Sequence, residues 1–566
     1  KEAERNTVVL NNQLEIIPLK KLEQRKIASI NLGFAHSITF DSLLNKYSKV
    51  DAFNGNIYLA DDNFKGLVDE LKFYNTVVLE LSDVSVFNKE VLSFIKEMEQ
   101  KKTLIIALFG DAKSLTQLNE IESPIIYCPQ HTNQGASLVA QVIFGGVEIN
   151  NRLTEDYTDK YLKNTGFSIA KTRFKFTVPE ELGLNVNHFK AIDAIAAEAI
   201  REKAAPGMVV FVAKAGHVIF NKAYGTHTYD KGSSKTLITD IFDLASITKT
   251  SATTIETMRL YEAGKLNLDT TISTYIAKTR NTNKANIKVK EVLLHQAGFI
   301  PFIPFYNNIK PTDFSRDSSE TYNIKVADSF YMQRSYFKDV MWKQMLESTL
   351  KTRGQYVYSD LSMYFMKEIV ETITQQPLAN YVKSQFYAPL GMHTTGFNPR
   401  YRFSKNEIIP TEQDKYFRKT LLWGYVHDQG AAMVGGVSGH AGLFSNASDL
   451  AILYQMLLNK GTYGGERYFK PKTIEMFTAK QSDISRRGLG FDRYDADSKA
   501  GYPSKLASNQ TYGHTGYTGT CVWVDPAKDL VYIFLSNRVN PEVSNKLLNL
   551  NIRSRIQDAI YKALEK

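Results

Sequence analysis

The stretch that decides the fold of this chain is Phe242-Asp243-Leu244-Ala245-Ser246-Ile247-Thr248-Lys249-Thr250. Ser246 and Lys249 are three residues apart, so on a helix they lie on one face, one turn apart. If the serine opens that helix, free N–H groups and the positive end of the dipole lie beneath it. A serine hydroxyl needs a neighbouring base to become a nucleophile, and a lysine can serve. A lone Ser-x-x-Lys is more often a solvated helix face, so further elements are needed.

Two such elements follow in order, Tyr358-Ser359-Asp360 and His514-Thr515-Gly516. This order resembles the serine β-lactamase and penicillin-binding-protein superfamily, with its Ser-x-x-Lys, Tyr-x-Asn and Lys-Thr-Gly elements. The tyrosine and the histidine resemble the class C β-lactamase-like esterases and peptidases. The resemblance covers roughly residues 180–566, and further segments carry it: Leu293-Leu294-His295-Gln296-Ala297-Gly298, Pro389-Leu390-Gly391-Met392, residues 435–443 and residues 513–519.

The resemblance implies an acyl-enzyme mechanism with assigned roles. Ser246 is the expected nucleophile, and Lys249 takes its proton or holds the tyrosine in place. Tyr358 is the partner base or acid, and which of the pair carries the proton stays open. The oxyanion hole is expected to combine the backbone N–H groups of Ser246 and Tyr517.

Two residues depart from the usual pattern of this superfamily. Asp360 stands where Asn is usual, and it could pair with Lys249 and raise its pKa, or recognise an amine or hydroxyl of the substrate. His514 replaces the lysine of Lys-Thr-Gly, which keeps hydrogen-bonding capacity but removes a permanent positive charge. We therefore expect slow or absent β-lactam hydrolysis.

Several other residues are candidates for substrate binding. Thr515 and Gly516 are expected to bind substrate, and Gly516 with Gly519 would let it approach an edge strand closely. Asn537 and Arg538 could pair with a substrate carboxylate. His440 and the segment 426–428 offer metal-ligand types, but their spacing matches no metal motif, so we expect a cleft-lining histidine and no metal or cofactor. The apolar run Phe299–Tyr306 could form a cleft wall or be buried.

Residues 1–150 alternate apolar strand patterns with helical ones. Strands are predicted at 26–32, 76–81, 103–109 and 124–128, with helices at 64–73, 89–100 and 135–144. This alternation predicts an α/β domain with a parallel-type sheet and flanking helices.

This region resembles the second, α/β-sandwich domain of family 3 glycoside hydrolases. The resemblance rests on Val8–Asn12 with Ile17-Pro18-Leu19, and on residues 140–153 with Phe144-Gly145-Gly146. In that family the nucleophilic aspartate belongs to a preceding barrel, which this sequence lacks. We therefore expect an adaptor domain. Because the sequence starts at Lys1 rather than methionine, we also expect an upstream part, such as a glycosidase barrel, to be missing.

Residues 151–180 are polar and predict a surface linker. Residues 181–566 are then the hydrolase domain, predicted to be α+β with an antiparallel sheet and a helical lobe. A helix is predicted at 186–201, strands at 207–213, 217–224, 521–525 and 530–536, and a terminal helix at 541–564.

Composition narrows the function classes. The 69 basic and 59 acidic residues give a net charge of +10, but no basic run interleaved with aromatics indicates nucleic-acid binding. The two cysteines, Cys128 and Cys521, exclude a disulfide framework. No apolar run reaches the length of a membrane helix. For localisation we expect the bacterial cell envelope, periplasmic or lipid-anchored, with the cytoplasm left open.

Three functions remain: a serine hydrolase acting on an amide or ester, a penicillin-binding-like sensor without turnover, and an inactive binding module. The presence of Ser246, Lys249 and Tyr358 together disfavours the third. The two resemblances on one chain suggest successive steps on peptidoglycan fragments. We therefore favour an N-acetylmuramoyl-L-alanine amidase, with a short-chain esterase or D-amino-acid peptidase as the alternative.

Overall fold

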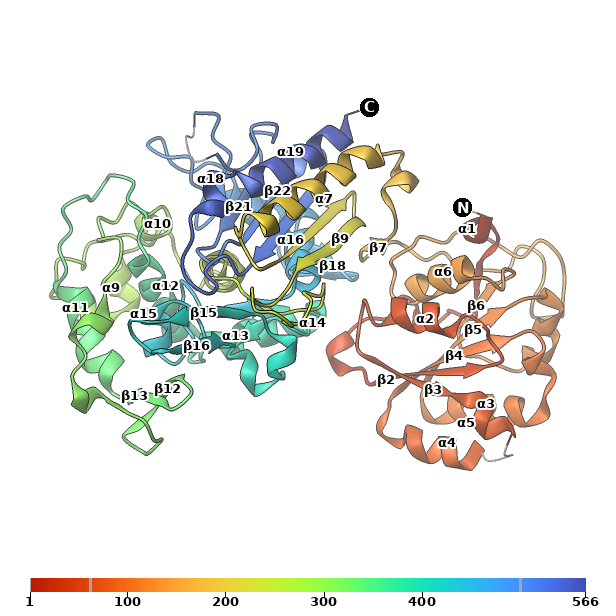
Figure 1. Cartoon of the computed structure of the whole chain (residues 1–566). Helices are drawn as coiled ribbons and strands as arrows, with labels where there is room; N and C mark the ends of the chain where they lie inside the picture. Colours follow the sequence, from red (N-terminus) through yellow and green to blue (C-terminus); the bar gives the residue numbers. More distant parts are fainter. Residues whose placement is uncertain (1, 61–63, 498–500, 566) are drawn as a thin grey trace. The chain divides into compact units, whose positions relative to one another are not determined.

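A computed structural model describes residues 2–60, 64–497 and 501–565. The chain forms two compact units (Figure 1). The first comprises Lys1–Phe176 with Ala388–Gly391 and Tyr463–Glu466, and the second comprises Thr177–Tyr387, Met392–Thr462 and Arg467–Lys566.

The first unit is built on a six-stranded sheet. Its order is β1 (Val8–Leu10), β6 (Ile125–Cys128), β5 (Thr103–Phe109), β4 (Thr76–Ser82), β2 (Ile27–Leu32) and β3 (Val50–Asn54). All neighbouring pairs are parallel except β1 with β6. Every residue of β4 is buried, which explains the continuous apolar runs, since parallel strands are covered on both faces.

Helices cover both faces of this sheet. Residues of α2 (Ser37–Leu44) and α6 (Asn133–Ile143) share one core, and residues of α4 (Phe64–Glu70) and α5 (Lys89–Lys101) share the other. The remaining helices of this unit are α1 (Glu2–Asn6), α3 (Gly55–Ala60) and α14 (Ala388–Leu390). The sequence analysis missed β1, which has three residues, and β3, whose side chains are mostly exposed.

The segment that the sequence analysis treated as a linker packs within the first unit up to Phe176. Phe167 and Ile169 form bridges with Val9 and Ile149. Tyr161 is fully buried, and its hydroxyl donates to the Leu118 carbonyl at 3.0 Å. The polar composition of residues 151–176 is therefore compatible with packing, because a few buried aromatic residues anchor the segment.

The second unit contains an antiparallel sheet, as predicted. Six of its strands lie in the order β20 (Asp492–Arg493), β21 (Tyr512–Thr515), β22 (Cys521–Asp525), β23 (Leu530–Ser536), β8 (Gly207–Lys214) and β9 (His217–Gly225). Helices α7 (Val186–Arg201) and α19 (Ile552–Leu564) share a core with one face, and α16 (Ala447–Leu458) contacts β8 and β23.

The terminal helix differs from the prediction. Instead of one helix over 541–564 there are two, α18 (Lys546–Asn549) and α19, separated by Leu550 and Asn551. Asn551 has φ 52°, a left-handed conformation that interrupts a right-handed helix.

A helical lobe lies between the two halves of the antiparallel sheet in the sequence (green in Figure 1). It contains η6, a π-helix at Lys249–Thr254, followed by α8 (Ile255–Glu262) and later by α12 (Leu361–Thr374). Its other helices are α9 (Ile272–Tyr275), α10 (Val289–Leu293), α11 (Trp342–Glu347), α13 (Leu378–Val382), α15 (Gln429–Met433) and α17 (Pro471–Thr478). One small sheet has the strand order β10 (Phe242–Asp243), β17 (Leu443–Ser445) and β14 (Gly396–Phe397). A second has the order β11 (Phe314–Ser315), β13 (Phe330–Gln333) and β12 (Tyr322–Ala327). A third pairs β15 (Pro410–Asp414) with β16 (Thr420–Trp423).

Among the described residues, no helix combines the length and the apolar character needed to cross a bilayer.

Candidate active site

Ser246 lies on a sharp turn between strand β10 and helix η6. The preceding Ala245 has φ 46°, a left-handed conformation that is strained for a residue with a Cβ. The Asp243 carboxylate holds this turn by accepting the Ala245 N–H at 2.8 Å and the His427 N–H at 2.7 Å. Strain of this kind persists where the surroundings impose it, commonly at functional sites.

Lys249 lies one turn after the serine, at the start of the π-helix. Its Nζ donates to Ser246 Oγ at 2.8 Å, which is the contact that the Ser-x-x-Lys spacing predicts. The side chain of Lys249 has no exposed surface, whereas Ser246 is half-buried. Local π-helix geometry is rare and occurs frequently at functional sites.

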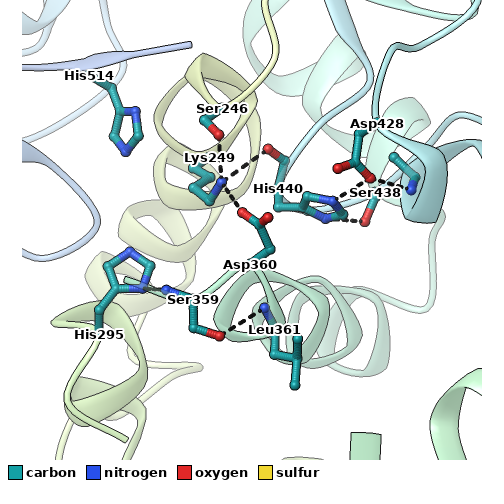
Figure 2. A network of polar contacts seen from close by, with 12 residues as sticks. Ser246, Lys249, His295, Ser359, Asp360, Leu361, Asp428, Ser438, His440 and His514 are labelled. Atoms are coloured by element: carbon teal, nitrogen blue, oxygen red, sulfur yellow. Dashed lines mark hydrogen bonds and ion pairs between the residues drawn. The ribbon is translucent and has the colours of Figure 1, made fainter. Parts of the chain in front are cut away.

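Lys249 is a paired ammonium. Its Nζ donates to Asp360 Oδ1 at 2.7 Å and to the His440 carbonyl at 3.4 Å (Figure 2). Burial by itself lowers the pKa of this amine, but the Asp360 carboxylate and the Tyr358 hydroxyl outweigh burial and hold the pKa above its usual value. The first alternative for Asp360, pairing with Lys249, is the one that the structure contains.

The ring of Tyr358 lies among cationic and imidazole groups. Lys249 Nζ is 4.9 Å from the ring centroid, and the Arg487 guanidinium carbon is 5.9 Å from it. The imidazoles of His295 and His514 lie 4.7 and 6.0 Å away, centroid to centroid. The three sequence elements, far apart along the chain, therefore meet around this ring.

His514 is a neutral imidazole at neutral pH. Burial, with the Arg487 and Lys249 charges nearby, lowers its pKa to about 3. Its Nδ1 lies 2.7 Å from the Thr515 carbonyl, so Nδ1 carries the proton and Nε2 is left as an acceptor. Nε2 is buried and has no hydrogen-bond partner within the described residues. The permanent positive charge of the usual lysine is thus absent, as the sequence predicted.

His295 is a site residue to which the sequence analysis gave no role. It is 1% exposed, and its Nδ1 accepts the Ser359 N–H at 3.2 Å, which leaves Nε2 as the protonated nitrogen. Burial and the neighbouring cations lower its pKa well below the usual value. In Figure 2 the rings of His295 and His514 point toward one another. The sequence signal that could have identified His295 was its position within the quoted segment Leu293–Gly298.

Tyr517 follows strand β21, where that strand has an unpaired edge. Among the described residues, β20 pairs with β21 only at Tyr512 and Gly513. The later residues of β21 therefore have no strand partner on the β20 side. A Cβ on Gly516 would lie 2.5 Å from the Leu244 carbonyl oxygen, so only glycine lets this strand approach the serine turn so closely. Within the described residues, neither the Ser246 N–H nor the Tyr517 N–H donates a hydrogen bond.

Two threonines that the sequence analysis did not select fasten the serine turn to the strand. Thr518 Oγ1 donates to the Asp243 carbonyl at 2.8 Å, and Thr520 Oγ1 donates to the Leu244 carbonyl at 3.2 Å. Both lie in the turn between β21 and β22, and Thr518 belongs to the quoted segment 513–519, but the sequence analysis gave neither a role.

The structure does not bring Asn537 and Arg538 to the substrate side. Arg538 is 5% exposed, and its guanidinium donates to the carbonyls of Tyr517 and Ser544. Asn537 bonds to the backbone of Gly207, His227 and Pro410. Both side chains are occupied by backbone groups, so they support the chain, and Arg538 positions Tyr517.

A cavity of about 460 Å³ opens beside Ser246. The predicted apolar loop contributes Phe302, Ile303, Phe305 and Tyr306 to its wall. Phe299 and Phe305 are each 2% exposed, so the run is partly a cleft wall and partly buried. The remaining lining residues are Ala245, Ser246, Tyr358, Asp360, Leu361, Tyr364, Glu412, Tyr416, His427, Asp428, Gln429, Gly430, His440, Ala441, Tyr517 and Val543.

His440 lines this cavity with both ring nitrogens engaged. Nε2 lies 2.8 Å from Asp428 Oδ1, and Nδ1 lies 2.9 Å from Ser438 Oγ. One ligand atom each of Asp360, Asp428 and His440 lies within 4.8 Å of the others, a grouping of metal-ligand types. It does not fit a metal well, because Asp360 already pairs with the Lys249 ammonium and both ring nitrogens of His440 are engaged by Asp428 and Ser438.

Comparison with known proteins identifies the family of this chain. A family model described as "Beta-lactamase" matches residues 192–557. This chain belongs to the β-lactamase family. It is a serine hydrolase of the β-lactamase/DD-peptidase superfamily, and residues 1–191 lie outside the match.

Two curated relatives carry the name "Putative D-alanyl-D-alanine carboxypeptidase". The protein from Escherichia coli O157:H7 is 32% identical over 423 residues, covering 69% of this chain and 93% of its own length. The protein from Salmonella gallinarum is 31% identical over 413 residues, covering 69% and 91%. A solved penicillin-binding protein homologue from Caulobacter crescentus is 17% identical, with a TM-score of 0.49 over 66% of this chain and 97% of that one.

Proposed function

We propose that this β-lactamase-family chain hydrolyses an amide bond of peptidoglycan fragments, the bond between N-acetylmuramic acid and L-alanine, through an acyl-enzyme on Ser246. The observation that carries the chemistry is the 2.8 Å contact of Lys249 Nζ with Ser246 Oγ at a cavity that Tyr358 also lines. A nucleophile, a cation and a phenol in one place are the parts that acyl transfer through serine requires.

In the proposed acylation, Ser246 Oγ attacks the carbonyl carbon as its proton passes to Tyr358. Lys249 is a poor base in this arrangement, because Asp360 holds it as an ammonium. Its charge instead lies 4.9 Å from the Tyr358 ring centroid, where it would stabilise negative charge on the phenol oxygen. The role of proton acceptor therefore passes to Tyr358.

The tetrahedral oxyanion would be bound by the N–H groups of Ser246 and Tyr517, both in the cavity lining. A backbone donor of this kind contributes about 3 kcal/mol of transition-state stabilisation. The C–N bond then breaks as Tyr358 returns its proton to the leaving nitrogen, which frees the L-alanyl peptide. Water repeats the sequence on the ester, using the same base, and releases the muramoyl acid and Ser246.

The choice of bond rests on the cavity charge. Among the described lining residues there is no Lys or Arg, and the Lys249 ammonium behind Ser246 is already paired with Asp360. A substrate carboxylate next to the scissile bond would therefore lack an unpaired cation. The muramoyl–L-alanine bond has no such carboxylate, whereas a terminal D-alanine has one. The printed names of the curated relatives favour D-alanyl-D-alanine carboxypeptidase activity as the second candidate.

The first unit supports the peptidoglycan context. Its resemblance to a family 3 glycoside hydrolase domain is the reason to expect that the hydrolase acts beside a β-N-acetylhexosaminidase, as parts of a longer fusion. We propose that this unit is an adaptor without glycosidase activity of its own, since no nucleophile and acid pair for a glycosidase is recognisable in it.

Mass spectrometry of digests tests the proposal. An N-acetylmuramoyl-L-alanyl peptide and a peptide ending in D-alanyl-D-alanine are incubated separately with the chain. We expect free L-alanyl peptide from the first and no D-alanine from the second. Ser246→Ala should abolish both the product and labelling by a fluorophosphonate, while Ser384→Ala, at an exposed serine, should change neither. Release of D-alanine alone would contradict the amidase proposal and favour D-alanyl-D-alanine carboxypeptidase activity.

A further inference from the structure

The cavity beside Ser246 carries more negative charge than the catalytic residues require. Besides Asp360, which Lys249 neutralises, it is lined by the carboxylates of Glu412 and Asp428. The described lining contains no lysine or arginine, and beside these two carboxylates it has only the imidazoles of His427 and His440. A cavity that faces a substrate with carboxylates and no permanent cation attracts cations and repels anions.

Asp428 is held as a carboxylate. Burial opposes its ionisation, but His440, the Ala431 N–H and His427 outweigh burial and lower its pKa. Oδ1 accepts the Ala431 N–H at 2.7 Å and lies 2.8 Å from His440 Nε2. No hydrogen bond to Oδ2 is present among the described residues, so this oxygen is available to a ligand.

Glu412 lacks a satisfactory partner. It is only 8% exposed, and its Oε2 has no hydrogen bond within the described residues, although His427 Nε2 lies 3.0 Å away with poor alignment. The His427 ring stacks on Tyr517 at 5.3 Å, which fixes its orientation. An ionised carboxylate buried without hydrogen bonds is costly unless a cation compensates it.

Asp414 shows how the same strand satisfies a carboxylate when its role is structural. It accepts Arg418 Nε at 2.8 Å and three backbone N–H groups, from Tyr416, Phe417 and Arg418. Glu412, two residues earlier on β15, has none of these. Glu412 lines the cavity, whereas Asp414 is not among its described lining residues.

Aromatic rings add a second cation-attracting feature. Phe302, Tyr416 and Tyr517 line the cavity and are 58, 85 and 52% exposed. Aromatic faces attract ammonium groups through their quadrupole.

We propose that this cavity binds a primary ammonium group of the substrate through Glu412 and Asp428. The inference rests on the proposed acyl-enzyme at Ser246 and adds the substrate class: fragments that carry a free amine, either the side-chain amine of a diamino acid or an N-terminal amine. Sugar hydroxyls would also donate to these carboxylates, but they would leave the charge uncompensated.

Covalent probes test the subsite independently of the peptide bond cut. Two fluorophosphonates are compared that differ only at the far end, one with a primary ammonium and the other with the same amine acetylated. Second-order rates of Ser246 labelling are measured for each. We expect the ammonium probe to react about tenfold faster, corresponding to about 1.4 kcal/mol. Short and long spacers distinguish an N-terminal amine from a side-chain amine.

Variants assign the preference to residues. Glu412→Gln and, separately, Asp428→Asn should reduce the ratio of the two rates toward one. The rate of the acetylated probe shows that Ser246 remains reactive in each variant. Glu542→Gln removes the same charge at an exposed carboxylate paired with Lys415, and the ratio should persist.

A ratio of one in the unmodified chain, or a ratio unchanged in both cavity variants, overturns the subsite. If neither probe labels Ser246, the acyl-enzyme proposal fails instead. If the preference is present but neither peptide is cut, the subsite stands and the proposed scissile bond is wrong.

Discussion

The Asp360 carboxylate accepts a hydrogen bond from the buried Lys249 ammonium at 2.7 Å, at the position where related sequences carry asparagine. An asparagine could not neutralise this lysine, so a carboxylate at this position changes the charge state of the site rather than its shape. It holds the proton on Lys249, and in the proposed mechanism the role of base therefore falls to Tyr358.

Asp360→Asn should therefore move the alkaline limb of the pH–rate profile to lower pH. Without the carboxylate, burial dominates and the pKa of Lys249 falls. We expect kcat/KM at pH 8 to fall by about 10²-fold. The control is Glu368→Gln, which removes from helix α12 a carboxylate paired with Lys278. The alkaline limb of this variant should stay where it is in the unmodified chain. An unshifted limb in Asp360→Asn would show that Lys249 does not set it.

Lys249→Ala and Tyr358→Phe should each reduce kcat by about 10³-fold, and the double variant should lose little more. Groups that act as one unit give strongly non-additive losses. Single-turnover rates with the muramoyl peptide measure all three variants. Losses that multiply in the double variant would contradict a shared proton relay.

The stability of the second unit should fall as the pH is lowered. The pKa of His514 is about 3 in the folded chain and about 6.5 when unfolded, so between these values only the unfolded state binds the proton. From pH 7.5 to 5.0 this one site should remove about 2 kcal/mol of unfolding free energy.

His514→Asn should abolish that part of the pH dependence. Urea unfolding at both pH values, followed by tryptophan fluorescence, measures it, because all three tryptophans lie in the second unit. His188→Asn, at a half-buried histidine of helix α7, is the control and should keep the full dependence. Equal pH slopes for the unmodified chain and His514→Asn would contradict the neutral, buried imidazole.

Gly516→Ala should inactivate the site. Its Cβ would lie 2.2 Å from Thr520 Oγ1 and 2.5 Å from the Leu244 carbonyl, and the latter cannot rotate away. We expect destabilisation by about 1–3 kcal/mol and loss of Ser246 labelling, as strand and turn separate. Gly354→Ala meets no atom within 4 Å, so it should cost only backbone strain and leave labelling intact. Normal labelling of Gly516→Ala would show that the close approach is not needed.

The local parts of this molecule could be predicted from its sequence. The strands over 521–525 and 530–536 and the helix over 186–201 have the predicted bounds, since apolar periodicity and turn residues are local signals. Contacts within one helical turn could be predicted equally well, as the Ser246–Lys249 pair shows. The linker and the terminal helix were predicted less well, because packing of a few side chains and one left-handed residue decided them.

What only the tertiary structure decided is which polar groups find partners. From the sequence, Arg538 was a candidate for binding a substrate carboxylate. In the structure its guanidinium donates hydrogen bonds to two backbone carbonyls instead. Glu412 belongs to no sequence motif, yet it lines the cavity, and its Oε2 has no hydrogen bond within the described residues. The sequence by itself determined the candidate nucleophile, its neighbouring lysine and the order of the three elements. Burial, pairing and charge at the site depend on residues that are distant in the chain, and folding alone brings these together.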